Sequence, residues 1–327
     1  MNKKYFPGAN TGDGFYSRFN GIIPPSDTKH YTYILKGGPG VGKNTLMKKI
    51  ARKAAEKGYD VEEFRCASDE KSLDAVRIPE LKTVLLDGTA PHSIDPVMPG
   101  IDEEIIDLGH FKNLGEFSTF RKSVSEFTKE NKRRYRAAYA MLGAAKLLKQ
   151  EAVNAAYDAI NTEKLRSLIK RLTDVKKHGE HRRLFACSAT PDGVMDFSPS
   201  FLPNDTIFFS GIVGEITMIE AEKLLADKCA EIFYGFVTPD VPHCIITGSS
   251  AIALGESGDS LREMYTHEPP SHISFCLEKA DRLVKRAVAE LEKALEAHDK
   301  IETLYRDYVD YDRVNYESDI LIKRIGV

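Results

Sequence analysis

Residues 37–45, which read GGPGVGKNT, constrain the fold of this chain more than any other stretch. The spacing of Gly37, Gly42 and Lys43 follows the phosphate-binding pattern G-x-x-x-x-G-K-[ST]. Glycines let the backbone curl until successive N–H groups point at phosphate oxygens, and a lysine ammonium can bridge the β- and γ-phosphates. The pattern predicts a nucleoside-triphosphate site. Its expected binding residues are Gly38, Pro39, Gly40, Val41, Gly42, Lys43, Asn44 and Thr45.

The segments on either side of this loop are those that a phosphate-binding loop requires. Residues 31–35 (YTYIL) form a short β-rich run that ends at the glycines. Leu46, Ile50 and Ala54 then recur at helical spacing until Gly58 ends the pattern. This order places the start of a helix, with its free N–H groups and positive dipole end, beside the phosphates.

Asn44 stands where the pattern has a serine or threonine, whose hydroxyl binds Mg²⁺. An amide oxygen is an acceptable ligand type, but asparagine is longer, and its NH₂ group would repel the cation if the amide were reversed. Three explanations stay open: weaker use of Mg²⁺, a different metal geometry, or a substitution introduced to disable the protein. Thr45 carries a hydroxyl one residue later, where we expect it to contact a phosphate rather than replace the metal ligand.

An apolar run, residues 82–87 (KTVLLD), ends in Asp87 and has the form of a Walker B strand. Such an aspartate holds Mg²⁺ directly or through water, so we expect Asp87 and Asn44 to form the metal site and Lys43 and Asp87 to be catalytic. The alternative is that Asp87 caps a turn with Gly88. No glutamate follows Asp87, so a base that activates water would come from elsewhere. The candidates are Asp69, Asp74, His92 and Asp95.

The size and charge of the chain argue against several classes of protein. With 327 residues it is long enough for two domains, each with its own core. A net charge of −3 gives no general attraction to nucleic acid or anionic membranes, and no apolar run reaches membrane-spanning length. The 5 cysteines are scattered and never spaced as C-x-x-C, which indicates reduced thiols in a cytoplasmic protein. We therefore expect neither a nucleic-acid nor a membrane partner.

An internal repeat is the second strong signal. Residues 11–15 (TGDGF) are echoed by residues 190–194 (TPDGV), and each echo precedes an apolar strand, a glycine turn and a helix. In the second copy the turn has lost one residue and Glu215 falls where the loop lysine would be, so that copy is not expected to bind a triphosphate. The strand of residues 84–87 is matched to residues 244–247, where threonine replaces the carboxylate. Four echoes in the same order favour a duplication with a decayed second half.

Each half continues into a region that is expected to form a helical arm. Residues 116–174 are rich in Lys, Arg, Ala and Leu, which predicts two long antiparallel helices with a turn at residues 161–163, where Thr162 is a candidate cap. Residues 271–323 carry apolar side chains at steps of three and four, a seam that needs a partner helix, either the other arm or a second subunit of a homodimer. The predicted domains are residues 1–178 and 179–327. The predicted fold class is α/β, a P-loop NTPase-like parallel sheet flanked by helices, duplicated, with long helical hairpin arms.

Several stretches together resemble a poorly characterised bacterial family. They are residues 37–45, residues 64–69 (FRCASD), residues 86–92 (LDGTAPH) and the tail that begins at residue 297 (AHDKIE). The family consists of duplicated P-loop ATPase-like proteins, found mainly in Gram-positive anaerobes and spore-formers, and the resemblance covers nearly the whole chain. It implies two tandem P-loop domains with helical insertions and ATP as the nucleotide. Relatives usually carry serine at the position of Asn44 and many have an intact second loop, so this chain departs in ways that bear on catalysis more than on binding.

Three functions are compatible with these features. The leading hypothesis is an ATP-binding NTPase with Mg²⁺-dependent hydrolysis at a single site in the first half; the residues themselves do not distinguish ATP from GTP. A small-molecule or nucleotide kinase is the second, because the absence of a glutamate after Asp87 suits transfer to an acceptor near residues 89–92. A switch or scaffold that binds ATP without turnover is the third, favoured by Asn44 and by the decayed second half.

Overall fold

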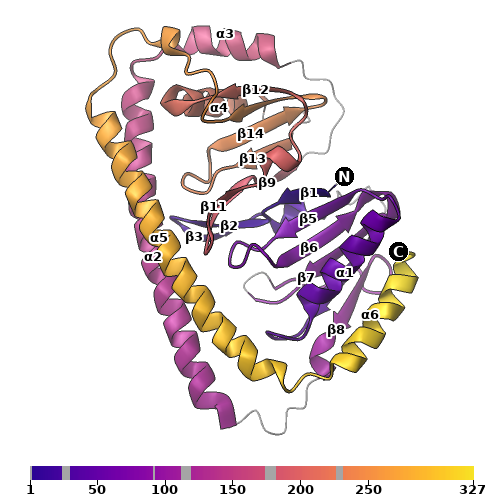
Figure 1. Ribbon diagram of the computed structural model, residues 1–327. Coiled ribbons are helices and arrows are strands. Elements are labelled where there is room, and N and C mark those ends of the chain that lie inside the picture. The colour runs from indigo at the N-terminus through magenta and orange to yellow at the C-terminus, as the bar shows by residue number, and fades with distance from the viewer. Residues whose placement is uncertain (1, 24–29, 91–92, 112–118, 174–181, 226–230) are drawn as a thin grey trace. The chain divides into compact units, whose positions relative to one another are not determined.

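A computed structural model describes residues 2–23, 30–90, 93–111, 119–173, 182–225 and 231–327 (Figure 1). The chain forms two compact units, each assembled from segments that are far apart in sequence. Unit 1 comprises Met1–Pro7, Ile22–Arg136 and Glu290–Val327, and unit 2 comprises Gly8–Gly21 and Ala137–Ala289. The predicted boundary after residue 178 divides the chain into two consecutive domains. It therefore misses that an N-terminal hairpin belongs to unit 2 and the C-terminal helix to unit 1.

Unit 1 is built on a six-stranded mixed sheet. In sheet order its strands are β1 (Asn2–Tyr5), β5 (Val61–Arg65), β6 (Leu73–Ile78), β7 (Thr83–Asp87), β4 (Tyr31–Lys36) and β8 (Glu103–Asp107). Strand β4 runs parallel to both of its neighbours, β7 and β8, but β6 is antiparallel to β5 and β7. The prediction of a parallel sheet is therefore wrong for β6. A parallel pair needs a crossover of a dozen or more residues, and only residues 66–72 connect β5 to β6.

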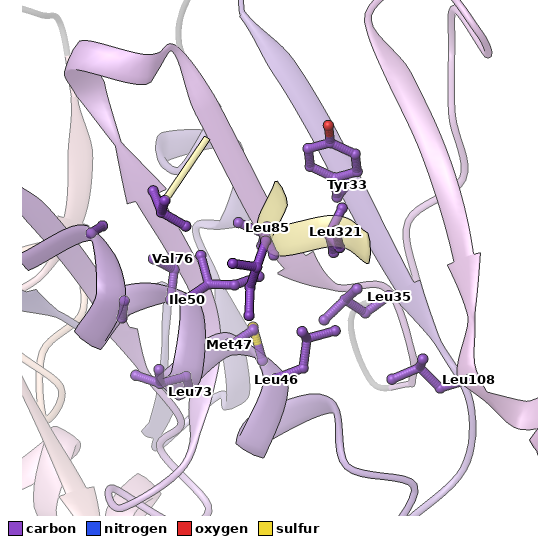
Figure 2. Close-up of a cluster of buried hydrophobic side chains, with 14 of the residues drawn as sticks. Tyr33, Leu35, Leu46, Met47, Ile50, Leu73, Val76, Leu85, Leu108 and Leu321 are labelled. Atoms are coloured by element: carbon purple, nitrogen blue, oxygen red, sulfur yellow. The ribbon is translucent and has the colours of Figure 1, made fainter. Parts of the chain in front are cut away.

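One face of this sheet packs against two helices, α1 (Lys43–Glu56) and α6 (Tyr311–Ile325). The buried side of α1 carries apolar residues at helical spacing, and they meet β-branched and leucine side chains from the strands (Figure 2). The side chains labelled in that cluster include Leu46, Met47, Ile50, Val76, Leu85 and Leu321. This core fixes the angle at which α1 leaves the loop that precedes it. Short 3₁₀ helices η2 (Pro79–Leu81) and η3 (Leu108–Phe111) complete the connections.

Unit 2 contains a five-stranded mixed sheet and two β-hairpins. In sheet order the strands are β12 (Asp205–Phe209), β15 (Ser250–Leu254), β14 (Pro242–Thr247), β13 (Glu231–Tyr234) and β9 (Arg183–Phe185). Helix α4 (Gly211–Leu225) packs on this sheet, and α3 (Thr162–Leu172) packs on α4. The hairpins are β2 (Gly8–Thr11) with β3 (Gly14–Ser17), and β10 (Cys187–Thr190) with β11 (Gly193–Asp196). The 3₁₀ helices η1 (Phe19–Gly21), η5 (Ser198–Ser200) and η6 (Arg262–Met264) lie in the loops.

Five strands of the two sheets follow the same order with the same orientations. β1, β5, β6, β7 and β4 of unit 1 correspond to β9, β13, β14, β15 and β12 of unit 2, with parallel, antiparallel, antiparallel and parallel pairs in turn. The sequence echo also forms the same turn twice: Thr11 Oγ1 donates to Gly14 O at 2.8 Å, and Thr190 Oγ1 donates to Gly193 O at 2.9 Å. One predicted match is wrong, because by position in the sheet β7 corresponds to β15, not to β14.

Two long helices, α2 (Arg121–Tyr157) and α5 (His272–Arg306), contribute residues to both units. In unit 1, Arg134 pairs with Glu290 at 2.9 Å and Asn131 donates to Ala294 O at 2.8 Å, so α5 is the antiparallel partner of α2 there. The predicted hairpin within residues 116–174 is therefore wrong: α3 is short, is capped by Asn161 rather than Thr162, and runs across the end of α2 (Figure 1). Among the helices of the described residues, none is both long and apolar enough to cross a bilayer.

Candidate functional site

The loop of residues 37–42 joins β4 to α1 in the middle of the unit 1 sheet. Gly37 has a φ of 131°, and a Cβ there would come within 2.9 Å of Val41 Cγ2 and 3.0 Å of the Gly109 backbone nitrogen. Gly42 has a φ of 92° and is the left-handed N-cap of α1. Residues with a side chain rarely adopt these φ angles, so the backbone of the loop requires glycine at both positions. The result is a curled loop that leads into a helix N-terminus, the arrangement that binds phosphate.

Lys43 and Asp87, the two residues predicted to be catalytic, lie next to each other. Lys43 Nζ is 3.6 Å from Asp87 Oδ2, and both side chains are largely buried. The same ammonium donates to Gly37 O at 2.5 Å and to Gly38 O at 3.3 Å, so it folds back over the loop. The pairing follows from topology, because β4 and β7 are parallel neighbours and their carboxyl ends meet at one edge of the sheet.

The carboxylate of Asp87 serves two neighbours. Its Oδ1 accepts hydrogen bonds from the backbone N–H of Thr89 at 2.9 Å and from Thr89 Oγ1 at 2.5 Å. Its Oδ2 faces Lys43. The alternative that Asp87 caps the turn after β7 is therefore confirmed, and its second oxygen points at the loop lysine. Its role as a Mg²⁺ ligand stays a prediction.

The side-chain amide of Asn44 is held by two hydrogen bonds. Its Nδ2 donates to Ser72 Oγ at 3.0 Å, and its Oδ1 accepts from the backbone N–H of Leu73 at 3.2 Å. Ser72 in turn donates to Asp69. The amide thus ties the first turn of α1 to the connection between β5 and β6, where a serine would be too short to reach both partners. Thr45 is exposed, and no group of His, Cys, Asp or Glu side chains among the described residues is arranged to hold a metal ion.

Of the four candidate bases, Asp74 has the environment that suits the task. Its side chain is buried, and this burial, together with the charges of Asp87 and Asp69, raises its pKa from 3.8 to about 7, while a hydrogen bond from Cys66 opposes the rise. A carboxyl group with a pKa near neutrality can accept a proton at physiological pH.

The other candidate bases are placed differently. Asp69 is held by Ser72, and Asp95 is exposed and pairs with Lys36 at 2.8 Å. His92 lies outside the described residues.

The C-terminal helices cover part of the loop, which the sequence did not indicate. Tyr311, the first residue of α6, donates its hydroxyl to Gly40 O at 2.8 Å. A Cβ on Gly40 would lie 3.4 Å from Glu302 O near the end of α5, and one on Gly42 would lie 3.2 Å from Val314. No local pattern links residue 311 to residue 40, so only the folded chain shows this contact.

Unit 2 has no comparable loop at the corresponding place. A single residue, Ser210, separates β12 from α4, and α4 begins at Gly211. Glu215, predicted to replace the loop lysine, lies in the body of α4 and pairs with Lys149 at 3.0 Å. A helix that starts directly after its strand leaves no curled backbone to surround a phosphate.

Comparisons of the chain with protein-family models, with curated proteins and with solved structures found no match.

Proposed function

We propose that unit 1 binds a nucleoside triphosphate, with ATP and Mg²⁺ as the expected pair, at the loop of residues 37–42. The observation that carries this proposal is the position of Lys43 Nζ, 3.6 Å from Asp87 Oδ2 at the shared carboxyl edge of two parallel strands. A bound triphosphate would take the Lys43 ammonium from the carbonyls of Gly37 and Gly38. Asp87 would then be free to orient Mg²⁺, which suits oxygen ligands.

The proposed reaction is hydrolysis of the terminal phosphate. Asp74 would accept a proton from the attacking water, because it is buried, lies close enough to Asp87 to feel its charge, and has a pKa of about 7. The product phosphate leaves with the oxygen of that water. The same base could accept the proton of an acceptor hydroxyl, as an aspartate does in kinases, so the assay below includes acceptors.

One observation favours a second function, a switch that binds ATP without turnover. Both ends of the Asn44 amide already bond to Ser72 and Leu73. A residue held in this way is a poor replacement for the hydroxyl that normally binds Mg²⁺. In that case the chain would hold ATP and change conformation without cleaving it.

We also infer that the two units descend from one duplicated P-loop ancestor. The support is the shared order and orientation of five strands and the repeated threonine-capped hairpin turn. In this view the second unit lost its phosphate loop when β12 and α4 became directly joined.

Calorimetric titration of ATP into the full chain, with and without Mg²⁺, tests the binding proposal. Lys43→Ala is expected to abolish binding, whereas Lys49→Ala, on the same helix and paired with Asp319 at 2.8 Å, should leave it intact. Retained affinity in Lys43→Ala would overturn the site. Steady-state phosphate release, with and without small hydroxyl-bearing acceptors, then separates hydrolase, kinase and switch. Tight binding with no turnover identifies the switch.

A further inference from the structure

Unit 2 holds three side chains in a line that the nucleotide proposal does not use. Cys187 Sγ lies 4.0 Å from His243 Nδ1, and His243 Nε2 lies 3.2 Å from Asp196 Oδ2. The imidazole ring therefore sits between a thiol and a carboxylate, with a different ring nitrogen facing each. This is the order of groups in which a carboxylate orients a histidine and the histidine takes a proton from a nucleophile.

The backbone explains why these side chains meet. Cys187 and Asp196 are directly opposite each other in the β10–β11 hairpin, so they share one face of it. His243 is the extra residue of a β-bulge in β14, since Pro242 pairs with Tyr234 and Cys244 with Phe233. A bulge turns a side chain away from the regular pleat, and bulges are over-represented next to active sites. The backbone N–H of Ser198 donates to Asp196 Oδ1 at 2.8 Å and fixes the carboxylate.

The arrangement suits proton transfer better than metal binding. The thiol and the carboxylate lie on opposite nitrogens of one ring, so they cannot converge on a single ion. No metal-binding group of three is present in the described part of the chain. Burial of the ring opposes its charge, but the neighbouring Cys187 sulfur and Asp196 carboxylate outweigh this and raise the pKa of His243 to about 10. A ring held between a thiol and a carboxylate is placed to exchange a proton with the thiol.

A small cavity gives this group access to a ligand. Cys187 and His243 both line it, together with Phe236, Thr238 and the Lys149–Glu215 ion pair. The wall thus combines a nucleophile, an apolar ring and a pair of opposite charges. Its size restricts entry to small molecules, and the ion pair favours those that carry a polar group.

We propose that Cys187, His243 and Asp196 form a second site, a thiol nucleophile that acts on small acyl compounds such as esters or thioesters. The thiol proton passes to His243 Nδ1 and the sulfur attacks the carbonyl carbon. The bond to the leaving alcohol or thiol breaks, and that group takes the proton from His243. Water then adds to the acyl carbon and gives its proton to His243. The carbon–sulfur bond breaks, the acid leaves, and the proton returns to the thiolate.

Alkylation of the full chain with a limiting amount of iodoacetamide, followed by peptide mapping, tests the thiol without any mutation. Cys187 and Cys276 are 7% and 6% exposed, so exposure alone predicts equal reactivity. The proposal predicts that Cys187 reacts at least about 100-fold faster, the size of a general-base effect. Equal rates, or a first reaction at another cysteine, would overturn it.

The second test uses p-nitrophenyl acetate as a small activated ester. The full chain should release a burst of p-nitrophenolate stoichiometric with protein, with the acetyl group on Cys187 by mass spectrometry. Cys187→Ser should abolish the burst, His243→Gln should slow it about 100-fold, and Cys276→Ser should leave it unchanged. A burst that persists in a folded Cys187→Ser variant would end the proposal.

Discussion

Asp74 in β6 and His243 in β14 are the extra residues of equivalent β-bulges. In unit 1 the pairs Phe64–Ala75 and Arg65–Leu73 skip Asp74, and in unit 2 the pairs Phe233–Cys244 and Tyr234–Pro242 skip His243. Each residue has a raised pKa and a cysteine beside it, Cys66 for Asp74 and Cys187 for His243. The two units therefore use one backbone irregularity to present a titratable group, an acid in one unit and an imidazole in the other.

The raised pKa of Asp74 makes a prediction about stability and pH. Because its pKa rises from 3.8 to about 7, the folded chain keeps a proton that the unfolded chain has lost between about pH 4 and pH 7. The free energy of unfolding should therefore fall as pH rises through this window and level off above it. Asp74→Asn cannot ionise, so at pH 8 we expect it to be more stable than the parent by roughly 2–4 kcal/mol. Urea unfolding at pH 5 and pH 8 measures this, and Asp95→Asn, at an exposed residue, serves as the control. An unchanged pH dependence in Asp74→Asn would contradict the assignment.

Substitution of Asn44 by serine should change stability and metal response in opposite directions. Serine cannot reach both Ser72 Oγ and the N–H of Leu73, so we expect a loss of about 1 kcal/mol in the free energy of unfolding. The new hydroxyl should at the same time increase the tightening of ATP binding by Mg²⁺. Chemical denaturation and calorimetry measure the two effects on one preparation. If Mg²⁺ tightens ATP binding equally in the parent and in Asn44→Ser, Asn44 does not limit the response to Mg²⁺.

Gly37 is expected to tolerate no side chain. Its φ of 131° and the 2.9 Å approach of a Cβ to Val41 predict that Gly37→Ala loses on the order of 2 kcal/mol of stability and loses ATP binding. Gly58 is the matched control, since its φ of 87° is also left-handed but nothing lies within 4 Å of a Cβ there. Gly58→Ala should cost less and leave binding unchanged. Equal effects of the two variants would mean that the loop adapts.

The buried carboxylate of Glu220 should be important for unit 2. It is 0% exposed and is bonded by Arg166 Nε at 2.5 Å and Lys223 Nζ at 2.7 Å. Glu220→Ala leaves those cations without their partner and should lower the free energy of unfolding by about 3 kcal/mol. Thermal unfolding of the variant against Glu163→Ala, at an exposed residue on α3, measures the effect. A difference below about 1 kcal/mol would show that solvent replaces the carboxylate.

The part of the site that sequence could predict was the part set by local spacing. The glycine loop, its flanking strand and helix, and the partnership of Lys43 with Asp87 all follow from short motifs and from the rule that parallel strands end at one edge. What depends on contacts between distant residues was not accessible. Tyr311 reaches Gly40 across the whole chain, and Asn44 finds Ser72 and Leu73 only after β6 has folded back.

The errors in the predicted fold have a common cause. Strand β6 is buried although it carries Asp74 and Arg77, and only the short connection before it gives its direction. The match of residues 84–87 to residues 244–247 rests on similar residue types. The strand order instead places β7 and β15 at equivalent positions of the two sheets. The partner of α2 is α5, from the far end of the sequence, because a seam of apolar residues specifies that a helix needs a partner but not which one.

Helix α5 ends against the loop that precedes α1. Its last turn lies against Gly40 in the loop of residues 37–42, and its residues 272–289 belong to unit 2. With 35 residues it is a rod of about 50 Å. A ligand that displaces the loop would therefore also displace the last turn of this helix. Hydrogen exchange in residues 302–306 should change on addition of ATP, and unchanged exchange there would show that the loop and the helix end move independently.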